Sequence, residues 1–202
     1  PTLGLALLTM LGTISLGAIL GIMAGYFRGI TEEVIMRVVD VMLSFPSQIM
    51  VFAVVALLGV SVQNVIIANV FIKWAWFARM IRTGVMQYRD CNFVRFSRCV
   101  GMPERFILFR HLLPSITSDL VVLASLDVGW AIINISTLSF LGLGVQAPTP
   151  EWGAMLNEAK NVMTSSPVQM IAPGVAIVVL VCVFNLMGDA MRDVLDPKEV
   201  QK

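Results

Sequence analysis

Residues 93–114 have the sequence FVRFSRCVGMPERFILFRHLLP, a charged stretch within an otherwise apolar chain. They include four arginines, one glutamate and the only histidine of the protein. Charged side chains are costly inside a bilayer, so a polar segment of this length between apolar stretches has to lie on one face of a membrane. There we expect it to form a structured element that touches a soluble partner.

The composition of the whole chain supports this interpretation. Of its 202 residues, 57% are hydrophobic and 13% are charged, whereas soluble domains carry about 25% charged residues. The length leaves room for one domain, residues 1–202, with about five or six membrane spans. The three cysteines show no C-x-x-C spacing and indicate no disulfide framework.

The apolar stretches predict an all-α, polytopic bundle of membrane-spanning helices with five visible spans. Four stretches are long enough to cross a bilayer, and a shorter run after Pro46 is expected to reach the far side as the fifth. These stretches are residues 3–27, 62–88, 115–140 and 167–187, with 49–59 as the shorter run. Because the chain opens on an apolar run without Met, we also expect one further span before Pro1.

Two local patterns refine the bundle. Residues 31–45 alternate charged side chains with Val and Ile, which predicts an amphipathic interfacial helix that Pro46 breaks. Glycines recur every fourth residue from Gly17 to Gly29. That spacing places them on one helix face, where we favour close packing within the bundle over a dimerisation motif.

The basic residues predict the orientation. If residues 93–114 are cytoplasmic, the alternation of spans puts residues 28–45, 79–111 and 188–202 on the same side, and these hold twelve of the fourteen Lys and Arg. This agrees with the positive-inside rule. Residues 142–166 then form an extracytoplasmic loop, and 188–202 form a cytoplasmic tail. Because the arginines follow one membrane face, nucleic-acid binding is not expected.

The sequence lacks the usual motifs for nucleotide binding and for hydrolysis. There is no G-x-x-x-x-G-K-[ST] phosphate loop, no H-E-x-x-H and no G-x-S-x-G. A single histidine cannot build a His-rich metal cage. We therefore expect a protein that is not an enzyme, with no cofactor of its own and no stable metal site.

The charged segment is specific in its order. Arg98, Gly101 and Arg105, followed by Arg110-His111-x-x-Pro114, resemble the cytoplasmic "EAA" loop of ABC-transporter permeases. Five further blocks resemble those of the dipeptide, oligopeptide and nickel permeases and occur in the same order along the chain. Two precede the charged segment: Arg37-x-x-Asp40 with Phe45-Pro46, and Trp76-x-Ala78-Arg79-x-x-Arg82. Three come after it: LSFLGLG at residues 138–144, Pro150-x-Trp152-Gly153-x-Met155-Leu156, and Gly188-Asp189 with Arg192-Asp193-x-Leu195-Asp196-Pro197. The details resemble most the second permease subunit of the nickel-import branch. The chain departs from the family at four positions: Phe96, Ser97, Val100 and Ile135.

This resemblance implies the type I ABC-importer permease fold in a bacterial inner (plasma) membrane. It implies that residues 89–114 are a coupling loop that docks on an ATPase, where ATP and Mg act. The implied coupling residues are Arg95, Phe96, Arg98, Gly101, Met102, Arg105, Arg110 and His111. Gly101 would allow a break between two short helices, and Pro103 would start the second. The implied partners are a second homologous permease chain, two ABC ATPase subunits, an extracytoplasmic substrate-binding protein and membrane lipids. The alternative is that the arginines only set topology and bind anionic lipid headgroups.

Polar residues within the predicted spans are candidates for a translocation path. Asp127 and Asn134 lie two helical turns apart on one face, and Lys73 lies deeper than the neighbouring arginines. They line a path or, equally well, form an interhelical pairing of Asp127 with Lys73. Trp152, in the outer loop, is either a docking residue for a binding protein or a membrane-interface anchor.

The leading functional prediction is a permease subunit of an ATP-binding-cassette importer for nickel ions or a nickel chelate. A dipeptide or oligopeptide permease is the alternative within the family. A secondary transporter or channel that works without an ATPase is more remote, because the two halves show no convincing repeat. The residues leave the choice between nickel and peptide open.

Overall fold

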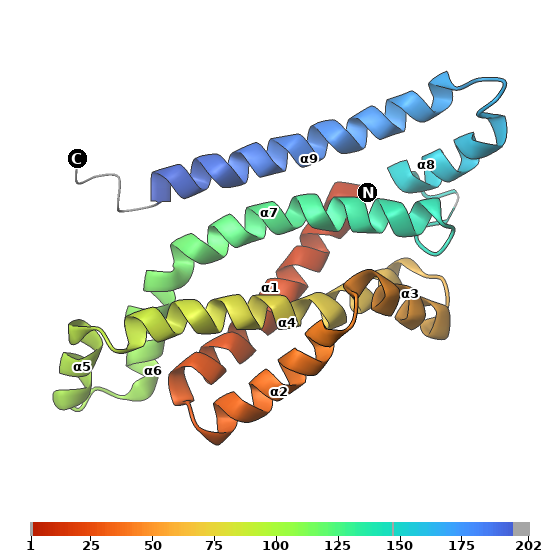
Figure 1. The fold of residues 1–202 in the computed structure, drawn as a ribbon. Helices are drawn as coiled ribbons and strands as arrows, with labels where there is room; N and C mark the ends of the chain where they lie inside the picture. Colours follow the sequence, from red (N-terminus) through yellow and green to blue (C-terminus); the bar gives the residue numbers. More distant parts are fainter. Residues whose placement is uncertain (1, 147, 196–202) are drawn as a thin grey trace.

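The computed structural model describes residues 2–146 and 148–195, and the regular elements in those ranges are all helical (Figure 1). The order is α1 (Thr2–Phe27), α2 (Ile30–Ser44), α3 (Ser47–Leu58), α4 (Val62–Arg89), α5 (Asn92–Cys99), α6 (Glu104–Ile107), the π-helical turn η1 (Leu108–Leu112), α7 (Leu113–Phe140), α8 (Trp152–Ala159), the 3-10 turn η2 (Lys160–Val162) and α9 (Val168–Leu195). The predicted all-α bundle is confirmed.

Long apolar helices account for the predicted spans. In the described part of the chain, Thr2–Phe27, Val62–Arg89, Glu104–Phe140 and Val168–Leu195 are each long and apolar enough to cross a membrane. The pair α2 and α3 is bent by 89° and gives a fifth span if it is counted as one. The bend has a local cause, since Phe45, which precedes Pro46, is extended with φ −101° and ψ 145°, as residues before proline usually are.

The charged segment is continuous with a span, which the sequence did not indicate. We expected the boundary near Pro114, but one helical stretch of 37 residues runs from Glu104 to Phe140. Pro114 lies in the first turn of α7, directly after the π turn η1. Its missing N–H would leave a carbonyl of a regular helix unpaired, and local π adjustments in membrane helices re-pair the backbone groups that a proline frees.

The glycine face of α1 packs against α4. A Cβ added to Gly21 would lie 2.7 Å from the Ala78 carbonyl oxygen, and one added to Gly25 would lie 2.9 Å from Val85 Cβ. The predicted helix contact is therefore confirmed, and its partner is α4. Gly29 differs from the others: its φ is +65° and nothing lies within 4 Å, so it serves the turn into α2.

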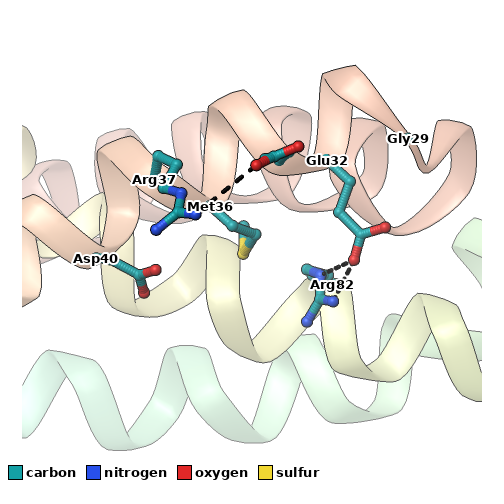
Figure 2. A pocket seen from close by; sticks show the side chains of 7 residues that line it. Gly29, Glu32, Met36, Arg37, Asp40 and Arg82 are labelled. Carbon is teal, nitrogen blue, oxygen red and sulfur yellow. Dashed lines mark hydrogen bonds and ion pairs between the residues drawn. The ribbon is translucent and has the colours of Figure 1, made fainter.

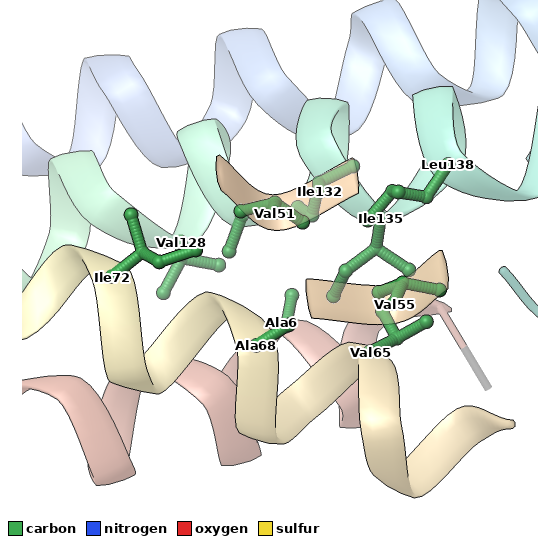
Figure 3. Close-up of a cluster of buried hydrophobic side chains, with 11 residues drawn as sticks. Ala6, Val51, Val55, Val65, Ala68, Ile72, Val128, Ile132, Ile135 and Leu138 are labelled. Carbon is green, nitrogen blue, oxygen red and sulfur yellow. The ribbon is translucent and has the colours of Figure 1, made fainter. Parts of the chain in front are cut away.

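Three clusters of buried apolar side chains hold the bundle together, and the smallest packs α2 against α4 around Val39 and Trp74. Figure 3 shows the first, in which α1, α3, α4 and α7 meet around Ile72, Ile132 and Ile135. The second joins α1 and α4 to the segment after Cys91 through Tyr26, Phe77, Val94, Ile107 and Leu112. The charged segment is thus packed against the bundle and is not a loose loop.

The outer loop and the C-terminal region contain more helix than expected. Residues 142–166 include α8 and η2. Helix α9 lies along α7 in Figure 1 and continues to Leu195, so the first residues of the predicted tail are helical. The rest of that tail, 196–202, with Asp196 and Pro197 of the C-terminal block, lies outside the described residues.

Candidate functional site

The charged segment folds as two short helices joined by a tight break. Helix α5 ends with the pattern of hydrogen bonds known as a Schellman motif, in which Met102 N–H donates to the Ser97 carbonyl and Gly101 N–H donates to the Arg98 carbonyl, both at 3.0 Å. Gly101 has φ +79°, a conformation that other residues adopt at a cost. Pro103 then caps α6. The predicted roles of Gly101 and Pro103 in the break are confirmed.

We call the exposed face of residues 92–110 the coupling surface. Val94 and Ile107 are 0% exposed and face the bundle, whereas Phe96 and Phe109 are 70% and 71% exposed. Seven of the predicted coupling residues are exposed on this segment: Arg95, Phe96, Arg98, Gly101, Met102, Arg105 and Arg110. Exposed phenylalanines among arginines are typical of a surface that binds another protein.

His111, the eighth predicted coupling residue, is less exposed than the other seven. It is only half-buried, and its Nε2 lies 3.1 Å from Ser97 Oγ. Its ring meets Phe93 and Phe106 edge-on, at centroid distances of 5.8 and 5.5 Å. Since the Ser97 hydroxyl donates to the Phe93 carbonyl at 2.9 Å, its oxygen is left to accept from His111. The histidine therefore ties α5 to η1 from within.

Two partners of the coupling surface were missed by sequence reasoning. In the sequence, Ser97 stands out only as a departure from the family pattern. Tyr26 carried no signal at all, yet Arg98 Cζ lies 5.2 Å from the centre of its ring, within the range of a cation–π contact. Both residues connect α5 to the rest of the bundle, one through η1 and one through the end of α1.

Ion pairs join α2 to α4. Arg82 pairs with Glu32, and Arg79 pairs with Asp40. Figure 2 shows Arg82 reaching Glu32 across an open pocket, with Arg37 and Asp40 further along α2. The sequence blocks that contain these residues were separate observations, and the structure brings them together.

Two of the predicted path residues meet near the middle of the bundle. Lys73 Nζ on α4 lies 3.0 Å from Asp127 Oδ1 on α7. Nζ also lies 3.1 Å from the centre of the Trp130 ring. Asn134, the third predicted residue, is 1% exposed, and its side-chain atoms have no hydrogen-bond partner among the described residues. The pairing of Lys73 with Asp127 is confirmed, and the path role stays a prediction.

The outer end of the bundle has a buried carboxylate that the sequence did not reveal. Glu151 is 1% exposed. It accepts hydrogen bonds from Thr2 Oγ1 at 3.2 Å, Ser136 Oγ at 3.0 Å and Ala154 N–H at 2.9 Å. It thereby caps α8 and fastens it to α1 and α7. The acid directly before an apolar helical turn was the available signal.

Trp152 follows Glu151 and begins α8. It is half-buried and lines an apolar pocket together with Thr2, Leu3, Met155 and Leu180. This position fits both of its predicted roles. Among the residues that the structure describes, no three His, Cys, Asp or Glu side chains gather in a way that could hold a metal ion.

The class defined by these features is a helical membrane protein with a structured segment that exposes arginines and phenylalanines. A family model described as the binding-protein-dependent transport system inner membrane component matches residues 17–201. The chain belongs to this family of inner membrane transport components. The resemblance found in the motifs is thereby confirmed.

Curated relatives in this family differ in what they are named for. The metal-staphylopine import system permease protein CntC of Staphylococcus aureus is 46% identical over 83% of this chain and 58% of its own length. The nickel transport system permease protein NikC of Escherichia coli is 42% identical over 97% and 71%. The glutathione transport system permease protein GsiD of Pectobacterium atrosepticum is 41% identical over 98% and 65%. The chain thus spans 58 to 71% of the length of these relatives.

A solved structure has the same fold. A chain of the MetNI methionine ABC transporter, solved in inward facing conformations, matches with a TM-score of 0.79. The match covers 96% of this chain and 93% of that one, at 17% sequence identity. The predicted ABC-importer permease fold is therefore confirmed.

Proposed function

We propose that this chain is a membrane-spanning permease subunit of an ATP-binding-cassette importer and forms half of its translocation path. The observation that carries the proposal is the helical continuity from Glu104 to Phe140. One end of that stretch lies on the coupling surface, and Asp127 lies within the membrane on the same stretch. A partner that moves α6 therefore moves the helix that carries Asp127.

The partner that fits the coupling surface is an ABC ATPase. Exposed aromatic side chains supply apolar anchors, and arginines supply charge-assisted hydrogen bonds. The contacts of His111 with Ser97 and of Arg98 with Tyr26 stiffen the segment, as a lever requires. A loop that only set topology would need its arginines, but not the Gly101 break or the contacts that hold the two short helices on the bundle.

The rest of the assembly follows from this role. A second homologous permease chain completes the path, two ATPase subunits bind and hydrolyse ATP with Mg, and an extracytoplasmic protein delivers the substrate. This chain contributes no catalytic residue and no cofactor. A channel or secondary transporter would work without ATP, so an ATP requirement for uptake separates the two classes.

The substrate that we propose is nickel, as an ion or a chelate. The motifs resemble the nickel-import branch, and one of the relatives is named for nickel transport. A dipeptide or oligopeptide is the second candidate, because the relative named for glutathione transport is nearly as similar, at 41% against 42% identity.

Gly101→Asp tests the coupling role. We expect the variant to insert in the membrane but to lose ATP-driven uptake, because a side chain at φ +79° strains the break between α5 and α6. The measurement is uptake into membrane vesicles together with recovery of the ATPase on purification.

Gly59→Asp is the matched control. Gly59 also has a positive φ, +89°, with nothing within 4 Å of an added Cβ, but it lies in the turn between α3 and α4. We expect this variant to transport normally. Normal uptake by Gly101→Asp would overturn the proposed function.

A further inference from the structure

A pocket of ≈ 190 Å³ lies beside the buried ion pair, where α2 bends into α3. Its walls come from three parts of the bundle: Leu43 and Ser47 at the bend, Ile72, Lys73 and Trp76 on α4, and Trp130 on α7. Lys73 lies near the middle of α4, so the pocket lies well inside the membrane-spanning part of the chain.

Two independent features indicate that this pocket is wet rather than open to lipid. The first is the 89° bend between α2 and α3, where helical hydrogen bonding is interrupted. Broken backbone at membrane depth is tolerated only where it is buried in protein or lines a water-filled cavity. The second is Lys73 itself, since ionisable residues within spans face the bundle interior or such a cavity.

The two charges of the ion pair are not equally accessible. The side chain of Asp127 is 4% exposed and that of Lys73 is 15% exposed, and Lys73, but not Asp127, lines the pocket. An ammonium group has three N–H donors. Its Nζ lies 3.0 Å from Asp127 Oδ1 and 3.1 Å from the centre of the Trp130 ring, and these two contacts leave a donor for a group in the pocket.

The pocket therefore offers a cation and two indole walls, which suits an anion with an apolar or cationic remainder. It does not suit a bare divalent metal ion. The carboxylate of Asp127 does not line the pocket, and no cluster of three metal-ligating side chains exists among the described residues.

We propose that Lys73, backed by Trp76 and Trp130, binds a carboxylate group of the transported molecule as it crosses the membrane. This assignment rests on the proposed importer function and adds the chemical class of the substrate. A metal carried by this importer then crosses as a carboxylate chelate, and a peptide crosses with its free C-terminal carboxylate bound here.

The test uses the complete importer reconstituted in liposomes and two matched pairs of probes. One pair is radioactive nickel alone and nickel with excess citrate; the other is a radioactive alanyl dipeptide and its C-terminal amide. We expect uptake of the carboxylate-bearing member of whichever pair is transported. Lys73→Gln should lower this uptake by about tenfold or more, the value of a lost charge-assisted hydrogen bond.

Further variants separate recognition from packing. Lys73→Arg keeps the cation and should retain most of the uptake. Lys73→Gln combined with Asp127→Asn removes the unpaired buried carboxylate as well and should remain defective. Lys160→Gln, at an exposed lysine of the outer loop, is the control and should behave as the wild type.

Three outcomes would overturn the inference: equal uptake of the amide and the free dipeptide, equal uptake of bare and citrate-bound nickel, or recovery of uptake in the double variant.

If no probe enters in an ATP-dependent way, the proposed function fails instead. Tryptophan fluorescence of the purified importer then tests the site alone. A change on adding citrate that is lost in Trp130→Phe supports the site, and its absence refutes it.

Discussion

At the scale of single residues, Glu151 joins three helices through the hydrogen bonds of one buried carboxylate. It is buried without a cationic partner among the described residues, and its two oxygens accept from two hydroxyls and one backbone N–H. Such a carboxylate is both an N-cap and a tie between three helices. Gly153 completes the junction, because any Cβ there would collide with the backbone of Ser136.

Glu151→Ala should destabilise the outer end of the bundle. The variant leaves the hydroxyls of Thr2 and Ser136 and the N–H of Ala154 without an acceptor, at a cost of about 2 kcal/mol. We expect a lower Tm for the purified importer in detergent. Glu158→Ala, at an exposed position of the same helix, is the control, and equal Tm values for the two variants would contradict the role of Glu151.

At the scale of elements, α2 is held to α4 by charge as well as by packing. The pair of Arg82 with Glu32 is the better protected, with side-chain exposures of 26% and 20%. Partly buried pairs are screened less by salt than exposed ones. The pair fixes the first turn of α2, and the bend that borders the Lys73 pocket lies at the other end of that helix.

A charge exchange measures this link. Arg82→Glu and Glu32→Arg should each lower the free energy of unfolding of the importer, because each places two like charges together, and the double exchange should recover about 1 kcal/mol in a double-mutant cycle. Arg37 and Glu33 form the comparison pair. They lie on one helix, 3.7 Å apart and 78% and 69% exposed, and should show almost no coupling. Equal coupling in both pairs would refute the link.

A comparison of the helices with the sequence shows which features could be predicted. Hydropathy, the glycine spacing and Pro46 predicted the spans, the close face of α1 and the break, because lipid and backbone geometry act on local sequence. The contact of Ser97 with His111 and the bond of Glu151 with Thr2 were not predictable, since these partners are 14 and 149 residues apart and unmarked by any pattern. The continuity of α6 with α7 was hidden by Pro114, which usually ends or begins a helix and here lies behind a π turn.

At the scale of the whole molecule, one helical stretch, from Glu104 to Phe140, connects three regions of the bundle. The coupling surface lies at the beginning of this stretch, Trp130 of the Lys73 pocket lies further along it, and α7 extends to the junction with α8. Closure of an ATPase pair on α5 and α6 would reach both other regions through this helix. Rigid elements that shift between discrete arrangements transmit motion in this way.

Docking of the ATPase should depend on the exposed phenylalanines of the coupling surface. We expect Phe96→Ser combined with Phe109→Ser to lower the amount of ATPase that co-purifies with the permease chains by about tenfold or more, because buried aromatic anchors carry most of the binding energy at such interfaces. The two side chains are 70% and 71% exposed without a partner protein, so their loss should leave the Tm of the permease chains unchanged. Ile30→Ser is the control, at an apolar residue that is 83% exposed on the same side of the membrane but outside the coupling surface. Undiminished recovery of the ATPase with the double variant, or an equal loss with Ile30→Ser, would show that the ATPase binds elsewhere.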